Sequence, residues 1–304
     1  MPTLHPDVVW RLATEQWADI SAQTPDLRPA LGLQRRLVRL MLDAASALDQ
    51  VSQGALATLT ASSTHDKWRR GLPALRNEAI AIPSGLKDIL PPLCTALAEG
   101  GAGDSAVHIR DAITGHSIDA ESLLRVSLAR NQKAIRTSAL HMGLSPDLVW
   151  LIGELGSAPL ANRLATTMDD GRSTIDDSWN RGYCPLCGSW PAFIEGMSGD
   201  LVLRCSYCAL GWSLTPHRCV YCGNADDTFV SAAPDLAHPA RRVELCGRCS
   251  GYTKVIDVGE PTPFPLLAIA DLATIDLDQG SMDRGYRRPE LFDLDTIEPR
   301  TSMC

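Results

Sequence analysis

The sequence predicts an α+β fold, with an all-helical N-terminal domain followed by two tandem ribbon modules that each hold a four-cysteine metal site. Three observations lead to this prediction. Apolar residues recur at helical spacing through about the first 170 residues. Eight of the ten cysteines lie between residues 184 and 249, in four Cys-x-x-Cys pairs. Short apolar runs typical of strands lie between these pairs.

Helix starts in the first part carry a repeated residue-Pro-Asp-apolar pattern, at residues 5–8, 24–27 and 145–148. Proline at a first helical position loses no hydrogen bond, and an early aspartate suits the helix dipole. Two apolar stripes follow the helical period: Leu33, Leu37, Leu40, Met41, Ala44 and Leu48, then Leu124, Leu128, Ile135, Ala139 and Met142. We therefore expect a helical bundle, with the basic cluster of residues 34–36 on its solvated face.

The helical pattern lapses between about residues 168 and 183. Residues 261–265 read as a proline-containing linker, residues 266–274 as a short apolar helix, and the tail from Asp283 as polar. The predicted domains are a helical bundle at 1–178, a first metal module at 179–215, a second at 216–260, and a C-terminal helix and tail at 261–304.

Each predicted module has two short strands between its cysteine pairs. In the first module, residues 192–195 and 201–204 flank a glycine-containing turn, which predicts a hairpin. In the second, residues 228–230 and 242–245 could pair across a longer loop. Residues 252–257 predict a closing strand.

The four cysteine pairs alternate in their glycine context. Glycine directly follows the first and third pairs, whereas Ala209 and Ser250 follow the second and fourth. This alternation, and the lower entropy of closing short loops, favour sequential pairing. A cross-braced arrangement of first with third and second with fourth remains open. Sequential pairing gives one site of Cys184, Cys187, Cys205 and Cys208, and another of Cys219, Cys222, Cys246 and Cys249.

Four thiolates per site predict two cofactors in all, one Fe or Zn ion at each site, because tetrahedral sulfur coordination suits both metals. Such closed sites argue for a structural role and against Lewis-acid hydrolysis. Disulfides and a thioredoxin-like dithiol are the alternatives. The N-terminus lacks the basic and apolar regions of a signal peptide, so we expect a cytoplasmic protein with reduced thiols. Cys94 and Cys304 stand apart from the pairs, and we expect them to be structural or incidental.

Charge argues against nucleic-acid binding. The chain has a net charge of −8, and residues 181–260 hold seven Lys/Arg against eight Asp/Glu. Phosphate binding needs an excess of cations, which this segment lacks. A small patch at Arg241, Arg242 and Arg248 leaves a ribbon-type nucleic-acid binder open as an alternative.

Motifs for catalysis or membrane insertion are missing from the sequence. It has no Gly-rich phosphate loop, no Gly-x-Ser-x-Gly elbow and no apolar run of about 18 residues. His217 could donate to a cluster sulfur or lie in an exposed turn. Asp271, Asp276 and Asp278 could form a carboxylate cluster, but we expect them to cap helices or face solvent. We therefore expect a protein that is not an enzyme and has no membrane span.

Several motifs together resemble the FdhE family of formate dehydrogenase accessory proteins. They are RGYCPLCGS (181–189), RCSYC (204–208), Trp212, RCVYCG (218–223), CGRC (246–249), YTK (252–254), ADLATIDLD (270–278) and GYRR (285–288). The resemblance covers about residues 179–290.

The resemblance implies a cytoplasmic accessory protein or chaperone with two rubredoxin-like metal modules. Its implied partner is the catalytic molybdenum or tungsten subunit of formate dehydrogenase, bound before export. Iron is associated with the cysteine sites of this family, and zinc also fits them. A homodimer is left open, and a redox-active rubredoxin-like electron-transfer protein is a second alternative. A thiol oxidoreductase is a third.

Overall fold

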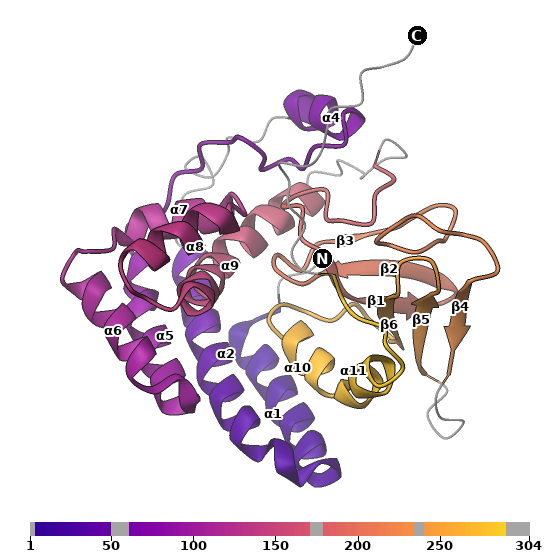
Figure 1. The fold of residues 1–304 in the computed structure, drawn as a ribbon, viewed down its shortest axis with the longest axis horizontal. Coiled ribbons are helices and arrows are strands. Elements are labelled where there is room, and N and C mark those ends of the chain that lie inside the picture. The colour runs from indigo at the N-terminus through magenta and orange to yellow at the C-terminus, as the bar shows by residue number, and fades with distance from the viewer. Residues whose placement is uncertain (1–3, 50–60, 171–178, 234–239, 290–304) are drawn as a thin grey trace. The chain divides into compact units, whose positions relative to one another are not determined.

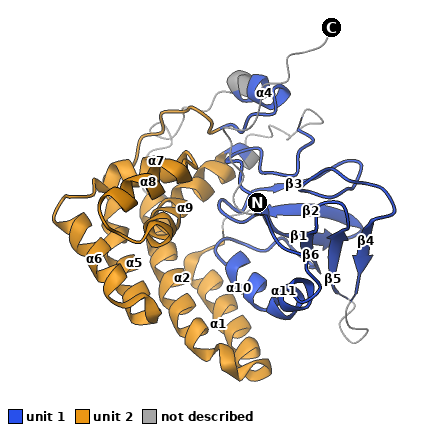
Figure 2. Cartoon of the chain, in the orientation of Figure 1, with its two compact units in different colours: residues 1, 61–74, 168–304 blue, residues 2–60, 75–167 orange. Residues whose placement is uncertain are grey.

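The computed structural model describes residues 4–49, 61–170, 179–233 and 240–289 (Figure 1). The chain divides into two compact units, shown in different colours in Figure 2. The helical unit comprises residues 2–60 and 75–167, and the sheet unit comprises residues 1, 61–74 and 168–304. The four-domain division given above stays a prediction.

The helical unit confirms the three predicted helix starts, because Pro6, Pro25 and Pro146 are the first residues of α1, η1 and α9. At the first of these, the side chain of His5 accepts a hydrogen bond from the backbone N–H of Asp7. The elements are α1 (Pro6–Gln23), η1 (Pro25–Leu27), α2 (Arg28–Asp49), η2 (Leu86–Ile89), α5 (Leu90–Leu97), η3 (Ala98–Ala102), α6 (Gly103–Thr114), α7 (Ala120–Leu128), α8 (Gln132–His141) and α9 (Pro146–Asp170), whose last residues belong to the sheet unit.

The predicted apolar stripe of α2 coincides only in part with the buried face of the helix. Met41 and Leu48 of the stripe are 8% and 3% exposed, whereas Leu33 and Leu40 are only half-buried. Leu31, Val38 and Leu42, which the stripe did not include, are at most 5% exposed. Since apolar residues cover two adjacent faces of this helix, the helical period alone could not choose between them.

The second predicted stripe belongs to two helices. Leu124 and Leu128 lie on α7, and Ile135 and Ala139 lie on α8. The break comes at residues 130–131, where Arg130 has a φ of 57°. The side chain of Asn131 then caps α8 by accepting a hydrogen bond from the N–H of residue 134.

A single six-stranded sheet forms the centre of the sheet unit, in the order β3-β2-β1-β6-β5-β4. All neighbouring strands are antiparallel except β1 and β6, which pair in parallel. The strands are β1 (Pro191–Met197), β2 (Asp200–Cys205), β3 (Gly211–Trp212), β4 (Phe229–Ala232), β5 (Arg241–Cys246) and β6 (Gly251–Asp257).

The sheet confirms the strands predicted between the cysteine pairs. β1 and β2 form a hairpin whose turn residues Ser198 and Gly199 both have positive φ, as a tight hairpin turn requires. β4 pairs with β5, and β6 closes the second module. Each module therefore has three strands in sequence, and the parallel β1–β6 pair joins the two modules into one sheet. The sequence did not predict this junction.

Three helices complete the sheet unit, namely α4 (Ala61–Arg69), α10 (Leu267–Leu272) and α11 (Ile275–Met282). α10 contacts β1, and α11 contacts β5 and β6. Leu267 of α10 packs in a buried cluster with Phe193 and Ala209. The predicted helix at residues 266–274 corresponds to α10, whereas α11 was not predicted. Cys304 and the tail from residue 290 lie outside the described residues.

Candidate metal centres

The four Cys-x-x-Cys turns share one backbone conformation. The residue after the second cysteine has positive φ in every turn, at Gly188, Ala209, Gly223 and Ser250. In three of the turns its N–H donates back to the carbonyl of the first cysteine, at 2.9–3.2 Å. Ala209 and Ser250 therefore adopt the same left-handed conformation as Gly188 and Gly223. The four turns alternate in sequence, with glycine present or absent after the second cysteine, but they do not alternate in backbone geometry.

The turns gather the eight predicted ligands into two clusters, which confirms sequential pairing over the cross-braced arrangement. Within each cluster the four sulfur atoms all lie within 4.8 Å of one another. One cluster is Cys184, Cys187, Cys205 and Cys208, and the other is Cys219, Cys222, Cys246 and Cys249.

The sulfur separations fit a tetrahedral metal site. Four sulfurs bound at about 2.3 Å to a central ion lie roughly 3.8 Å apart. The Cys187 sulfur lies 3.4 and 3.8 Å from two others of the first cluster, and the Cys222 and Cys246 sulfurs are 3.6 Å apart. A disulfide needs about 2.05 Å, and every cysteine among the described residues is free. Each cluster could hold one ion, and this donor set suits zinc and iron alike.

The two clusters differ in their exposure to solvent. All four cysteines of the first cluster are buried, whereas Cys222 and Cys249 of the second reach the surface. Burial raises the pKa of Cys184 and Cys208 well above the usual thiol value. A metal must displace those protons, so its binding to the first cluster releases them.

Within the second cluster, backbone N–H groups favour the thiolate of Cys246, whereas burial raises the pKa of Cys219 and raises that of Cys249 to about 11. Desolvation opposes the ionisation of Cys246, but hydrogen bonds from the N–H groups of Cys249 and Arg248 lower its pKa to about 7. In the first cluster, the N–H groups of Tyr207 and Cys208 both point at the Cys205 sulfur, at 3.4 Å. Both arrangements place positive dipole ends beside a sulfur that would be anionic when it binds a metal.

A segment distant in sequence supports the first turn. Trp68 of α4 donates its indole N–H to the carbonyl of Pro185 at 2.9 Å, and the N–H of Ala74 donates to the same carbonyl at 2.8 Å. The Tyr183 hydroxyl donates to the carbonyl of Gly71 at 2.8 Å. Residues 61–74 lie within the predicted bundle of residues 1–178, and no motif in them indicated this role.

The first cysteine turn of one module contacts the first cysteine turn of the other. A Cβ added to Gly182 would lie 1.7 Å from the carbonyl oxygen of Val220, so only glycine fits there. The rings of Trp190 and Tyr221 meet edge to face, with centroids 5.1 Å apart. The modules are therefore packed together near their clusters as well as joined through the sheet.

A buried ion pair lies beside the first cluster. Arg204 Nη1 donates to Glu195 Oε2 at 2.5 Å, and both side chains are fully buried. Arg204 also donates to the carbonyls of Ala209 and Thr262, and the N–H of Thr262 donates to Glu195 Oε1 at 2.9 Å. The pair thus fixes β1, β2, the turn after Cys208 and the linker of residues 261–265.

The remaining predicted polar residues are mostly engaged with each other. His217 lies in an exposed loop, where its Nε2 is 2.6 Å from Oε1 of Glu244 on β5, and it pairs with this carboxylate rather than with a cluster sulfur. Arg241 pairs with Asp276 and Arg242 pairs with Asp257. Two of the three arginines in the predicted basic patch are therefore neutralised by carboxylates. No helix in the described ranges is long and apolar enough to cross a membrane.

Comparison with known proteins points to one family. No family model matches the chain. It is 30% identical to a protein FdhE homolog of Aquifex aeolicus over 165 residues, which cover 51% of this chain and 54% of the relative. It is 29% identical to a protein FdhE homolog of Edwardsiella ictaluri over 177 residues, covering 56% and 53%. The chain spans about half the length of the curated relatives it matches.

The fold agrees with these matches. The crystal structure of the FdhE protein from Pseudomonas aeruginosa matches the chain with a TM-score of 0.57 at 21% identity, and covers 95% of this chain and 96% of that one. The chain is similar in sequence to FdhE homologs and shares the fold of an FdhE protein. Its α+β fold, a helical unit followed by a sheet with two four-cysteine clusters, is confirmed.

Two aspartates of the ADLATIDLD segment, Asp271 and Asp278, form an ion network around a buried lysine of β6. Lys254 is fully buried and lies 2.8 Å from Asp271 and 2.7 Å from Asp278. Arg288 lies 3.0 Å from the same two carboxylates. The Tyr252 hydroxyl donates to Asp278 at 2.8 Å. The expectation that Asp271 and Asp278 only cap helices or face solvent is therefore wrong, whereas Asp276 is exposed and pairs with Arg241.

Burial opposes the ionisation of Asp271, but the charges of Arg288 and Lys254 outweigh it and lower its pKa. The sequence signal for this network is the occurrence of three motifs, YTK, ADLATIDLD and GYRR, in one chain. Only the fold brings the three motifs together.

Proposed function

We propose that the chain is an accessory protein for the production of active formate dehydrogenase, without catalytic activity of its own. It binds the catalytic subunit in the cytoplasm, before export. The eight clustered cysteines are its metal ligands, and the two metals hold the shape of the surface that makes the contact. The observation that carries the proposal is the pair of four-sulfur clusters beside one sheet, in a chain that is similar to FdhE homologs.

Closed sulfur sites suit a structural role. Four protein ligands leave no coordination position for a substrate, so a bound metal contributes folding free energy, on the order of 10 kcal/mol per site. Because β1 and β6 pair across the two modules, both metals stabilise the same sheet. The metal sites therefore support a rigid recognition surface and do not need to touch the partner.

Exposed apolar residues of the sheet unit support a recognition surface there. Ile275 and Met282 at the two ends of α11 are 41% and 52% exposed, and Val230 of β4 is 46% exposed. Large apolar side chains at the surface are typical of protein contacts when they gather on one element. We place part of the recognition surface on α11.

Co-purification of the formate dehydrogenase catalytic subunit with the tagged chain tests the proposal. Cys→Ser variants of either cluster should reduce the recovery of the subunit, whereas Cys94→Ala, which changes a buried cysteine outside both clusters, should not. Ile275→Ser with Met282→Ser should also reduce recovery, against Leu140→Ser on α8 as the matched control, since Leu140 is 65% exposed. Full recovery after loss of both metals would disprove the proposal.

Electron transfer by iron is a second candidate, and the exposure of Cys222 and Cys249 favours it. An iron ion at the second cluster would lie near the surface, within reach of a redox partner. Iron bound by four thiolates would show visible charge-transfer bands and a reversible one-electron titration. Elemental analysis of anaerobically purified protein that finds only zinc would exclude this candidate.

A further inference from the structure

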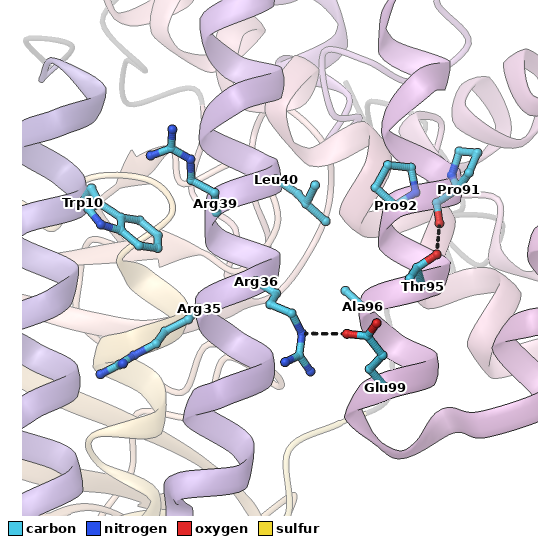
Figure 3. Close-up of a pocket in the computed structure, with 10 residues that line it drawn as sticks. All are labelled: Trp10, Arg35, Arg36, Arg39, Leu40, Pro91, Pro92, Thr95, Ala96 and Glu99. Carbon is cyan, nitrogen blue, oxygen red and sulfur yellow. Dashed lines mark hydrogen bonds and ion pairs between the residues drawn. The ribbon is translucent and has the colours of Figure 1, made fainter.

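An open groove of about 680 Å³ lies on the helical unit, between α1, α2 and α5 (Figure 3). Its lining combines apolar side chains with three arginines of α2. The lining residues are Trp10, Arg35, Arg36, Arg39, Leu40, Pro91, Pro92, Thr95, Ala96 and Glu99. All of them belong to the helical unit, and none contributes to the cysteine clusters.

The arginines form one cationic edge, because positions 35, 36 and 39 are neighbours on a helix surface. Arg39 lies over the ring of Trp10 at 5.5 Å, and Arg35 lies over Trp17 at 5.3 Å. These stacking contacts hold the two guanidinium groups in place without neutralising them. In a chain with a net charge of −8, three arginines beside one groove mark a local reversal of charge.

Only weak pairs oppose this positive charge. Arg36 points across the groove toward Glu99, at 3.8 Å, and both side chains are about half exposed (Figure 3). Arg39 pairs with Asp43 at 3.1 Å, also at the surface. Exposed pairs of this kind contribute roughly 0–1 kcal/mol and are easily exchanged for a better partner. Arg35 has no carboxylate partner among the described residues.

We propose that this groove binds an acidic amphipathic segment of a partner protein. The apolar side chains of such a segment would pack on Trp10, Leu40 and Ala96, and its carboxylates would pair with the arginines, whose planar groups can bind a carboxylate through two hydrogen bonds. The groove is open rather than enclosed, which suits a peptide better than a small molecule that needs an enclosed pocket. The rim also holds Glu99, which disfavours the phosphates of a nucleic acid. This proposal is independent of the function proposed above.

Fluorescence anisotropy with the full chain tests the proposal. The probe is a labelled peptide with Leu and Phe at helical i, i+4 spacing and Asp or Glu between them. A matched peptide with Lys at the acidic positions should not bind, and binding of the acidic peptide should weaken as salt rises. The same peptide should bind Arg36→Glu/Arg39→Glu at least about tenfold more weakly.

Arg125→Glu/Arg136→Glu is the matched control. These two arginines are about as exposed as Arg36 and Arg39, each has one carboxylate partner, and their reversal changes the net charge equally. This variant should bind the peptide within about twofold of the parent chain.

A second variant keeps all the arginines but fills the groove. Thr95→Trp places a bulky side chain where the exposed Thr95 donates to the carbonyl of Pro91 (Figure 3). It should weaken peptide binding as strongly as the charge reversal, with an unchanged circular-dichroism melt. Equal binding of the acidic and Lys peptides, unchanged binding by either groove variant, or tighter binding of a single-stranded oligonucleotide of equal charge would overturn the proposal.

Discussion

Removing the charge of Glu195 should strongly destabilise the sheet unit. Glu195→Gln keeps the size of the side chain but leaves Arg204 fully buried without a counter-ion. Removing one partner of a buried ion pair costs about 3–5 kcal/mol. The new amide group adds to this, since Glu195 accepts from Thr262 N as well as from Arg204, and an amide has only one oxygen for the two donors.

Hydrogen–deuterium exchange of peptides from β1 and β2 measures this effect, because it reports on the sheet unit separately from the helical unit. With metal content held constant, Glu195→Gln should reduce protection more than about a hundredfold, as expected for 3 kcal/mol or more. Asp257→Asn is the matched control in the same sheet. It breaks the pair of Arg242 with Asp257, at 2.9 Å, whose side chains are 26% and 46% exposed, and should cost less than about 1 kcal/mol.

The double variant Glu195→Leu/Arg204→Met should recover part of the lost protection, because replacing both ions leaves no unpaired charge, while the N–H of Thr262 and the carbonyls of Ala209 and Thr262 still lose a partner. If Glu195→Gln and Asp257→Asn reduced exchange protection by similar amounts, the proposed difference between buried and exposed ion pairs would be refuted. A double variant less protected than Glu195→Gln alone would refute the reasoning as well.

Three further predictions concern the second module. A chromogenic chelator should remove metal in two phases, with the fast phase lost in Cys222→Ser, because Cys222 and Cys249 are exposed whereas the first cluster is buried. Ser250→Gly should raise the free energy of unfolding by about 0.5–1 kcal/mol in denaturant titrations, since Ser250 has a φ of 53° and glycine adopts this conformation without strain. The lowered pKa of Asp271 means that its stabilisation is present above the unfolded value of about 3.9 and is lost as pH falls further, so Asp271→Asn should flatten the acid limb of a stability–pH profile.

The local parts of this structure could be predicted from the sequence because their signals are local. Two residues between paired cysteines fix a turn, and the short loops between pairs fix which turns share a site. Proline and aspartate at a helix start act within one turn, so the starts at Pro6 and Pro146 were predicted to the residue. The hairpin of β1 and β2 follows from the turn at Ser198 and Gly199.

The parts that escaped prediction depend on contacts between distant residues. Ile194 pairs with Val255 across the parallel junction of the modules, a contact that no local pattern encodes. Trp68 supports Pro185 from more than 100 positions away. A buried lysine such as Lys254 is stable only when carboxylates neutralise its charge, and here two aspartates of a distant helical segment do so and also pair with an arginine beyond that segment. Without knowledge of this contact, the aspartates look like helix caps.

The buried Glu195–Arg204 pair and the ion network around Lys254 link the cysteine clusters to the C-terminal segment that contains α11. Arg204 precedes Cys205 and holds the linker at Thr262, and Lys254 follows the turn of Cys249 and holds Asp278 on α11. Loss of metal from either cluster should therefore loosen the C-terminal segment as well as the turn itself.

Hydrogen exchange before and after metal removal tests this coupling. Residues 275–282 should lose protection together with β2 and β5 when metal is removed, and should regain it when zinc is restored. Protection of α11 that stayed constant while the strands exchanged would contradict the coupling. Because α11 carries the exposed Ile275 and Met282, such coupling would let closed metal sites control a protein-binding surface without a metal taking part in the contact.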